Sequence, residues 1–539
     1  MKDIKLLDCT LRDGGYVNDW EFGRDNIVNI FERLVSAGVD IIEVGFLDER
    51  RPFDPNRSIF PDTESANKIY GRLDKGNAMV VAMIDYGTCG IEHLQPASET
   101  CLDGIRVIFK NFKKEKAIAF CKEVKALGYK VFAQAVSITS YTDRELLDLV
   151  DLVNDLEPEA LSIVDTYGLM HEDHVQHYFE LMDYNLKPGI KIGYHAHNNF
   201  QLAYSNSIEL LRVPTRRTIV IDGSLHGMGK SAGNLPIELM SMYLNGNYGK
   251  SFDISQLLEA IDMNIMPFYR KTPWGYKMFY YIAASHQCHP NYVDWLMNKQ
   301  TLSLSQITEI LNMLQGEKKL LYDKEYIEEL YMEYQSRECN DDEALRELSA
   351  KWRDQEILVL GPGANLLRQQ DRVHRYIEEK DPVVITINYL PEEFHTDYVF
   401  LTNSRRYMQL ITRLALLAEN GQWKRDFRTV ATSNIPKVSE NFDYILNYNS
   451  LIDRNAEYMD NSFVMLLHVM AETGVRRIAC AGFDGYSTKA ENYFNSEMDY
   501  RIAKEKFHGL NEYVAKNLRD LKGTLEVEFV TDSRYPEYL

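Results

Sequence analysis

Hydrophobic positions in the first 250 residues follow two alternating periods. Short runs of β-branched and apolar residues, typical of buried strands, alternate with longer stretches whose apolar residues recur every three or four positions, as in amphipathic helices. The strand pattern occurs at residues 4–10, 41–46, 78–85, 104–109, 130–138, 161–166, 191–197 and 218–223. The helical pattern occurs at residues 25–37, 63–72, 113–127, 143–156, 171–183, 201–211 and 234–243. Eight such units predict a closed (β/α)8 TIM barrel over residues 1–250; a doubly wound open sheet, which has the same local pattern, is the alternative.

The rest of the chain changes pattern twice. Residues 251–350 have a helical pattern with many aromatic and charged residues, and they predict a helical extension that ends in an acidic linker near 338–347. Strand patterns return after Glu356 and are separated mostly by helical ones. They occur at residues 357–360, 383–388, 398–402, 429–432, 444–446, 478–481 and 525–530. We therefore expect a second, Rossmann-like α/β domain over residues 351–539, which makes the whole protein α/β in class.

The charge balance argues against nucleic acid as a partner. The chain of 539 residues has 60 Lys and Arg against 80 Asp and Glu, so its formal net charge is −20, and a field of that sign repels phosphate backbones. The first residues lack the apolar core of a signal peptide, and no window of about 18 apolar residues predicts a membrane span. Seven scattered cysteines without a CxxC pair are typical of reduced thiols rather than of a zinc ribbon. We therefore expect a cytoplasmic protein that binds neither nucleic acid nor membrane, and the sequence is compatible with a homo-oligomer.

Two motifs lie at the C-terminal ends of predicted strands, where barrel enzymes have their active sites. Arg12 and Asp13 follow the first strand and precede two glycines that let a ligand approach the backbone closely. Asp13 can bind a hard cation through oxygen, and Arg12 can neutralise an anionic substrate oxygen. His195 and His197 end the seventh strand, where residues two apart share a face, so both imidazoles can bind one metal ion. A strand-end salt bridge and structural histidines are the alternatives.

A glycine-rich loop, Asp222-Gly-Ser-Leu-His-Gly-Met-Gly-Lys-Ser-Ala-Gly-Asn234, follows the eighth predicted strand. Its Gly-Lys-Ser run imitates a phosphate-binding loop, but the position that needs the first glycine of that motif is Ser224. The spacing therefore argues against a P-loop. We expect the loop to lie close to a ligand, with a plain flexible connection as the alternative.

In order and spacing, these three segments resemble the DRE-TIM metallolyase superfamily, which includes 3-hydroxy-3-methylglutaryl-CoA (HMG-CoA) lyase, isopropylmalate and homocitrate synthases, and 4-hydroxy-2-oxovalerate aldolase. The resemblance covers residues 1–250. It implies a divalent metal ion at the C-terminal mouth of the barrel, Mn²⁺ or Mg²⁺, with Zn²⁺ or Co²⁺ as alternatives, and with Asp13, His195 and His197 as ligands. Asn234 matches a position that ligates metal in some members, and Arg12 matches the residue that stabilises the enolate.

The resemblance leaves the catalytic base open. Tyr16 stands where the oxovalerate aldolases have a histidine, and the glycine-rich loop has His226 but lacks the catalytic cysteine of the CoA lyases. Glu43 matches a second-strand carboxylate of several members, with a buried partner for Arg12 as the alternative. Thr166 matches a sixth-strand position near the substrate in some branches, with a structural role as the alternative. The resemblance thus assigns catalysis to Arg12, Tyr16, Glu43 and His226, and substrate binding to Thr166.

The Arg-Asp-Gly-Gly form of the first motif and the loop ending in Gly-Met-Gly-x-x-Ala-Gly-Asn resemble the oxovalerate aldolases more than the acyl-CoA synthases, which usually have a glutamine soon after the first glycine. This favours aldol cleavage or condensation of a 2-oxo acid such as pyruvate with an aldehyde, through a metal-stabilised enolate. Claisen condensation or lysis of an acyl-CoA is one alternative. A non-catalytic barrel in a sugar-nucleotide-binding protein is another.

In the second domain, Leu360-Gly-Pro-Gly-Ala-Asn365 joins a strand to a helix, and backbone N–H groups in such a turn can hold phosphate. The full GxGxxG fingerprint is absent because residue 366 is Leu. With a strand that ends at Asn388 and a late Gly-Phe-Asp484, residues 355–490 resemble bacterial sialyltransferase-like and pterin-diphosphokinase-like domains. The resemblance implies a nucleotide or nucleotide-sugar site at Gly361, Gly363, Asn388 and Asp484; an accessory domain without a ligand is the alternative. From the domain pairing we hypothesise a role in making a bacterial surface sugar.

Overall fold

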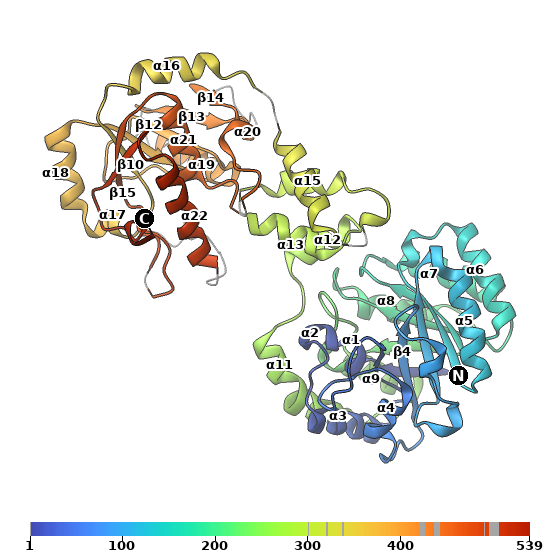
Figure 1. The fold of residues 1–539 in the computed structure, drawn as a ribbon. Coiled ribbons are helices and arrows are strands. Elements are labelled where there is room, and N and C mark those ends of the chain that lie inside the picture. Colours follow the sequence, from blue (N-terminus) through green and yellow to red (C-terminus); the bar gives the residue numbers. More distant parts are fainter. Residues whose placement is uncertain are drawn as a thin grey trace. The chain divides into compact units, whose positions relative to one another are not determined.

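The chain forms two compact units, Met1–Pro290 and Asn291–Leu539, and Figure 1 traces their elements. The structure, a computed structural model, describes residues 2–299, 301–319, 322–336, 339–419, 426–435, 442–456, 458–489, 491–494 and 506–538. The division between the units falls inside the segment 251–350 that the sequence pattern sets apart as a helical extension.

The first unit is a closed barrel of eight parallel strands. The hydrogen-bonded order is β1, β9, β8, β7, β6, β5, β4, β2, and β1 pairs back onto β2 at Leu7 and Ile41. This closure excludes the open sheet and confirms the predicted TIM barrel. The strands are β1 (Ile4–Asp8), β2 (Ile41–Leu47), β4 (Met79–Asp85), β5 (Gly104–Phe109), β6 (Lys130–Ala135), β7 (Ala160–Asp165), β8 (Lys191–Ala196) and β9 (Ile219–Gly223), and a short β3 (Ile59–Phe60) pairs with β2.

Helices cover the outside of the barrel (Figure 1). They are α3 (Arg24–Ser36), α4 (Thr63–Tyr70), α5 (Lys114–Ala126), α6 (Asp143–Leu156), α7 (Glu172–Asn185), α8 (Ala203–Arg212) and α9 (Ile237–Tyr248). After them, α10 (Ile254–Ala260), α11 (Met266–Lys271) and α12 (Met278–Ser285) belong to the same unit. Local chemistry fixes several boundaries: Thr142 and Glu145 form a capping box at the start of α6, which satisfies N–H groups that a helix start leaves unpaired.

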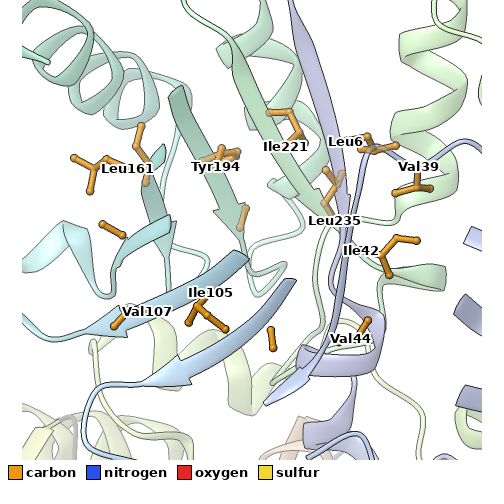
Figure 2. Packing of buried hydrophobic residues seen from close by; sticks show 14 of the residues in the cluster. Leu6, Val39, Ile42, Val44, Ile105, Val107, Leu161, Tyr194, Ile221 and Leu235 are labelled. Carbon is orange, nitrogen blue, oxygen red and sulfur yellow. The ribbon is translucent and has the colours of Figure 1, made fainter. Parts of the chain in front are cut away.

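Alternate residues along each strand build two different layers, because strand side chains point to opposite faces. Leu6, Ile42 and Ile221 pack outward with the helices, and Figure 2 shows them around the strands. Leu7, Ile41 and Val220 belong to a separate apolar cluster whose members come from strands all around the barrel, so they fill its interior. Further along the same strands, the inward positions carry buried charges instead, and this change of character places polar chemistry at the C-terminal mouth.

In the second unit, the described residues form seven parallel strands in the order β14, β13, β12, β11, β10, β15, β16, which confirms the predicted second α/β sheet. The strands are β10 (Ile357–Leu360), β11 (Val383–Ile387), β12 (Tyr398–Leu401), β13 (Arg428–Thr432), β14 (Tyr444–Leu446), β15 (Arg477–Ala481) and β16 (Glu526–Phe529). The helices are α13 (Pro290–Lys299), α14 (Leu304–Asn312), α15 (Lys324–Gln335), α16 (Asp342–Trp352), α17 (Asn365–Arg368), α18 (Gln370–Lys380), α19 (Ser404–Glu419), α20 (Tyr448–Leu451), α21 (Ser462–Glu472) and α22 (Phe507–Asp520). Within the described parts of the chain, no helix has both the length and the apolar character needed to cross a bilayer.

Candidate metal centre

Three side chains from distant parts of the sequence meet at the C-terminal mouth of the barrel. Asp13 ends the short helix α1 (Thr10–Asp13) directly after β1, His195 lies in β8, and His197 follows β8. One ligand atom from each residue lies within 4.8 Å of the others, and all three residues are buried. The backbone at His197 also bridges to Asn234, which brings the end of the glycine-rich loop to the same place.

The turn that presents Asp13 is built by Asp8 and Thr10. The first predicted strand is two residues shorter than expected, because the Asp8 carboxylate accepts the Thr10 N–H at 2.9 Å and the Thr10 hydroxyl at 2.8 Å and turns the chain into α1. The Asp13 N–H then donates to the Cys9 carbonyl at 2.8 Å. Complete burial raises the pKa of Asp8 to about 7, so this turn contains an acid whose ionisation is costly.

Unpaired ligand atoms remain at the cluster. His197 Nε2 lies 3.5 Å from Asp13 Oδ2 without a hydrogen bond, and Asn234 Oδ1 is buried without a partner among the described residues. The amide of Asn234 donates instead to Asp13 Oδ2 at 2.8 Å. Buried polar atoms are nearly always satisfied, so an unpaired nitrogen and oxygen beside a carboxylate fit a divalent cation.

The ionisation states of Asp13 and His195 also suit a cation. Burial opposes the ionisation of Asp13, but the charge of Arg12 and, to a smaller extent, the nearby His197 hold the pKa of its carboxyl well below the usual range. Burial lowers the pKa of His195, which favours the neutral imidazole that a metal ion requires.

His195 is oriented by Asp222. His195 Nδ1 lies 3.1 Å from Asp222 Oδ2. When Nδ1–H donates to this carboxylate, the lone pair of Nε2 is left available to bind a metal ion. A carboxylate behind a histidine is how proteins commonly fix the tautomer and ring angle of a metal ligand. Arg106 in turn donates to the same Asp222 oxygen.

Arg12, Glu43 and Arg106 join the cluster into one buried charge network. Arg12 Nε donates to Glu43 Oε2 at 2.7 Å, and its Nη1 donates to Asp13. Glu43 Oε1 lies 3.1 Å from Nη1 of Arg106. Because each buried charge has an opposite partner, the desolvation cost of the network is offset. Glu43 therefore pairs with Arg12, which is the alternative role expected from the sequence, and this pairing holds Arg12 beside the candidate ligands.

Comparison with known proteins assigns the barrel to a family. Residues 3–263 match the family model described as HMGL-like. These residues are an HMGL-like domain. The chain is 25% identical over 272 residues to 4-hydroxy-2-oxovalerate aldolase from Pseudoalteromonas translucida (strain TAC 125), which covers 49% of this chain and 77% of that protein. It is 24% identical over 276 residues to 4-hydroxy-2-oxovalerate aldolase 6 from Rhodococcus jostii (strain RHA1), covering 50% and 76%. The solved HMG-CoA lyase from Brucella melitensis aligns with a TM-score of 0.40 and 15% identity, covering 50% of this chain and 99% of that chain.

Tyr16 and Lys230 lie together at the edge of the HMGL-like domain's charge network. The Lys230 ammonium lies 5.4 Å from the centroid of the Tyr16 ring, within the range of a cation–π contact. The Lys230 N–H donates to Asp13 Oδ2 at 3.2 Å. Although Tyr16 is 43% exposed, desolvation of its hydroxyl raises its pKa, with a further contribution from the Asp13 charge. Desolvation also lowers the pKa of Lys230.

His226 and Thr166 have contacts that the sequence does not reveal. The His226 ring packs edge-on against Tyr269 at 5.0 Å and against Trp274 at 5.9 Å. Burial lowers the pKa of this imidazole. The Thr166 hydroxyl accepts the N–H of Ser137 at 2.7 Å, so it ties the ends of β6 and β7 together, as its structural alternative proposed.

Sequence reasoning missed Arg106 and Asp222 as parts of this site. Both are almost fully buried, at 1% and 2% exposed. The alternation of side chains along a strand could have found them. Arg106 lies two residues after Gly104 and Asp222 two residues after Val220, which both line the barrel, so both charged side chains face inward. A charged residue on the inner face of a strand is a stronger signal than a charged residue alone.

A second group of metal-type ligands lies on the surface of the first unit. Glu49, Glu92 and His93 also bring ligand atoms within 4.8 Å of one another, but none of the three is buried. Exposed acidic groups are commonly solvated without an ion, so this group is not a candidate metal site.

In the second unit, the four predicted nucleotide-site residues have partners within the protein. Gly361 and Gly363 donate their N–H groups to the carbonyls of Ala481 and Gly482, both at 2.8 Å, so neither amide is free to hold phosphate. Asn388 donates to Thr402 Oγ1 at 3.2 Å and Ser462 Oγ at 2.9 Å, and its oxygen accepts the Thr402 N–H at 2.9 Å. Asp484 alone keeps an unpaired atom, Oδ1, among the described residues.

Proposed function

We propose that the HMGL-like domain is a divalent-metal-dependent aldolase that cleaves or forms a carbon–carbon bond of a 2-oxo acid such as pyruvate. The observation that carries the proposal is the buried meeting of Asp13, His195 and His197 beside Arg12. The similarity of the chain to 4-hydroxy-2-oxovalerate aldolases supports a 2-oxo acid and an aldehyde as the small-molecule substrates.

The donor set fits a hard or borderline cation. One carboxylate and two imidazoles, with the unpaired Asn234 oxygen as a further ligand, suit Mn²⁺ or Mg²⁺ and are also used by Zn²⁺ and Co²⁺. When bound, such an ion supplies a Lewis acid for the negative charge that develops on a carbonyl oxygen. Asp222 would orient His195 in this set, and the Asp165 carbonyl, 3.3 Å from His197 Nδ1, would orient His197.

Arg12 is the catalytic residue that this arrangement supports best. Glu43 and Asp13 fix the guanidinium through Nε and Nη1, and Nη2 donates no hydrogen bond to the described part of the chain. That remaining group can donate to an anionic substrate oxygen from a fixed position, and a donor that needs no reorganisation stabilises the transition state more than the ground state.

Tyr16 and Lys230 would complete the substrate site. With its raised pKa, Tyr16 stays protonated at neutral pH, so its hydroxyl acts as a hydrogen-bond or proton donor at the substrate hydroxyl rather than as a ready base. Lys230 offers a cation to the carboxylate of the 2-oxo acid. Thr166 and the neutral His226 remain proposals for substrate contact and for proton transfer, respectively.

A cleavage assay tests the proposal. Full-length protein loaded with Mn²⁺ or Mg²⁺ is given 4-hydroxy-2-oxo acids, and pyruvate is measured by coupling to lactate dehydrogenase. We expect metal-dependent pyruvate release, and we expect Arg12→Gln to lower kcat by about 100-fold or more. Failure to form pyruvate from any of these acids, with the metal bound, would overturn the 2-oxo acid assignment.

Two other outcomes favour the alternatives. Saturation by acetyl-CoA with release of thiol would assign the domain to acyl-CoA chemistry. Absence of metal binding, with no effect of His195→Ala on any measured property, would support a non-catalytic barrel. Free thiols, such as the buried Cys9, Cys121 and Cys480, suit a reducing compartment, so we place the reaction in the cytoplasm and, from the domain pairing, in the making of a surface sugar.

A further inference from the structure

The second unit contains a cavity of about 920 Å³, large enough for a nucleotide-sized ligand. Its walls come from α13 and α15, from the loops after β10, β11, β12 and β15, and from the start of α21. None of its lining residues belongs to the proposed aldolase site. The cavity is therefore a candidate for a separate binding function.

The cavity lies where the strand order of the sheet reverses. Starting at β10, one half of the sheet continues through β11 to β14, and the other half consists of β15 and β16. In open parallel sheets, ligands bind outside the carboxyl ends of the strands at such a reversal, because the loops there diverge to opposite faces and leave a crevice. Gly363 after β10 and Asp484 after β15 line the cavity at this point.

The two glycines bring the adjacent loops together. A Cβ on Gly361 would lie 2.6 Å from the Gly482 carbonyl, and a Cβ on Gly363 would lie 2.4 Å from Asp484 Oδ1. Glycine is thus required for the close approach of the loop after β10 to the loop after β15. Since both amides are used in that contact, side chains have to supply the recognition of a ligand.

Asp484 lines the cavity and keeps one unsatisfied acceptor. Its side chain accepts the Asn365 N–H through Oδ2 at 2.8 Å, and Oδ1 has no partner in the described parts of the chain although the residue is only 5% exposed. A buried carboxylate oxygen without a partner is costly. A hydroxyl or amine of a ligand would satisfy it.

Cationic groups lie on the same walls. Arg406, Arg454 and Lys506 line the cavity, and α21 begins there, which adds the positive end of a helix dipole. The acids Asp294, Glu328 and Asp460 line other parts of the same cavity. The cationic side chains and the helix start are the groups that can bind an anion such as phosphate.

Aromatic side chains form another part of the wall. The rings of Phe463 and Phe483 stack on each other with their centroids 4.0 Å apart, and both line the cavity although they are only 6% and 8% exposed. A planar base or the apolar face of a sugar packs well against such rings. An anion site, a hydroxyl acceptor and an aromatic wall in one cavity match the three parts of a nucleotide.

We propose that this cavity binds a nucleoside phosphate or its sugar ester, with Asp484 accepting a ligand hydroxyl or amine and with Arg406, Arg454 and Lys506 facing the phosphates. The site is independent of the metal centre in the barrel. It gives the second unit a binding function that the aldolase activity does not require.

Isothermal titration calorimetry of the full chain, which measures ligand affinity from the heat of binding, tests this site. The probes are CMP, UDP, GDP and ADP, the sugar esters UDP-glucose and GDP-mannose, and inorganic phosphate. We expect saturable binding of at least one nucleotide, about tenfold weaker binding to Asp484→Asn, and weaker binding of the nucleotide but not of its uncharged nucleoside to Arg454→Ala. Asp532→Asn is the matched control, because Asp532 is an exposed carboxylate of the same unit that bonds Arg372 and does not line the cavity.

The outcomes are distinct from those of the aldolase assay. Tighter binding of a sugar ester than of its nucleotide identifies a nucleotide-sugar site, and equal binding identifies a nucleotide site; both support the proposal. The proposal would be overturned if no nucleotide binds, or if inorganic phosphate binds as tightly as the nucleotides do. It would also be overturned if Asp484→Asn binds the nucleotide with the affinity of the wild type. Loss of nucleotide binding in His195→Ala would also overturn it, since the ligand would then sit in the barrel.

Discussion

Arg106 illustrates how much of the metal centre depends on one residue away from the ligands. Its guanidinium lies between Glu43 and Asp222, and these carboxylates in turn hold Arg12 and His195. Removing one member of a buried ion network leaves charges without partners, which costs far more than the net worth of the network. Arg106 is therefore a positioning residue for both ends of the site.

Replacing Arg106 by Met should lower the free energy of unfolding by about 3–5 kcal/mol, because Glu43 and Asp222 become unpaired in the barrel interior. Urea denaturation of the full chain measures the change. Arg50→Ala is the control, because Arg50 pairs with Asp48 at the surface and 66% of its side chain is exposed. This substitution should lower the free energy of unfolding by less than about 1 kcal/mol. Equal stability of the two variants would show that the network is not stabilising as described.

Asp8 should make stability depend on pH. Its folded pKa of about 7 exceeds the unfolded value of about 3.9, so between these values the folded state binds more protons and stability falls as pH rises. Asp8→Asn cannot ionise. Relative to it, the wild type should lose about 2 kcal/mol of unfolding free energy between pH 5 and pH 7, measured by urea titrations at each pH. Parallel pH profiles for the two proteins would contradict this.

At the residue scale, the sequence predicted what strand geometry dictates. His195 lies near the end of β8 and His197 directly after it, and Asp13 follows the end of another strand. Their meeting therefore follows from the alternation of side chains along a strand and from barrel closure. The partners that orient them were not predictable in the same way. Arg106 lies in an apolar run, Gly104-Ile-Arg-Val-Ile-Phe109, and a single charge there does not reveal which carboxylates face it.

At the scale of elements, the loop from Asp222 to Asn234 shapes the site through its glycines. A Cβ on Gly229 would lie 2.4 Å from Asn234 Nδ2 and 2.6 Å from Asp13 Oδ2. The glycine therefore allows the backbone to approach the candidate ligands. The sequence predicted that this loop lies near a ligand. The role of its Gly229 is close packing against Asp13 and Asn234, which does not require the glycine spacing of a P-loop.

Gly229→Ala should displace Asp13 or Asn234 and weaken Mn²⁺ binding at least tenfold, since misplaced ligands lose affinity quickly. Calorimetric titration with Mn²⁺ measures the effect, and circular dichroism checks that the barrel is still folded. Gly246→Ala is the control, because a Cβ there meets nothing within 4 Å in helix α9 and alanine favours a helix. Binding by Gly229→Ala with wild-type affinity would contradict the close approach.

At the scale of the whole molecule, two units with separate cores should unfold separately. The barrel core and the core around β10 to β16 are distinct clusters of buried side chains. Barrel closure and the strand order of the second sheet could not be predicted with certainty from the sequence, because the local βα pattern is the same in closed and open sheets. Only long-range pairing, such as that of β1 with β2, decides between them.

Scanning calorimetry of the full chain should therefore resolve two transitions. Mn²⁺ should raise the Tm of one of them, because a ligand stabilises only the unit that binds it, and should leave the other unchanged. A nucleotide that occupies the second unit should do the reverse. One transition that moves as a whole with either ligand would mean that the two units are thermodynamically coupled.

The central claim is that Asp13, His195 and His197 hold one divalent cation, and a Mn²⁺ titration of the full chain followed by electron paramagnetic resonance tests it most directly. We predict one tightly bound ion per chain, lost in His195→Ala and in His197→Ala and retained in His93→Ala, which disrupts only the exposed group with Glu49 and Glu92. A wild-type chain that binds no ion, or one whose ion survives both barrel variants and disappears with His93→Ala, would contradict the account.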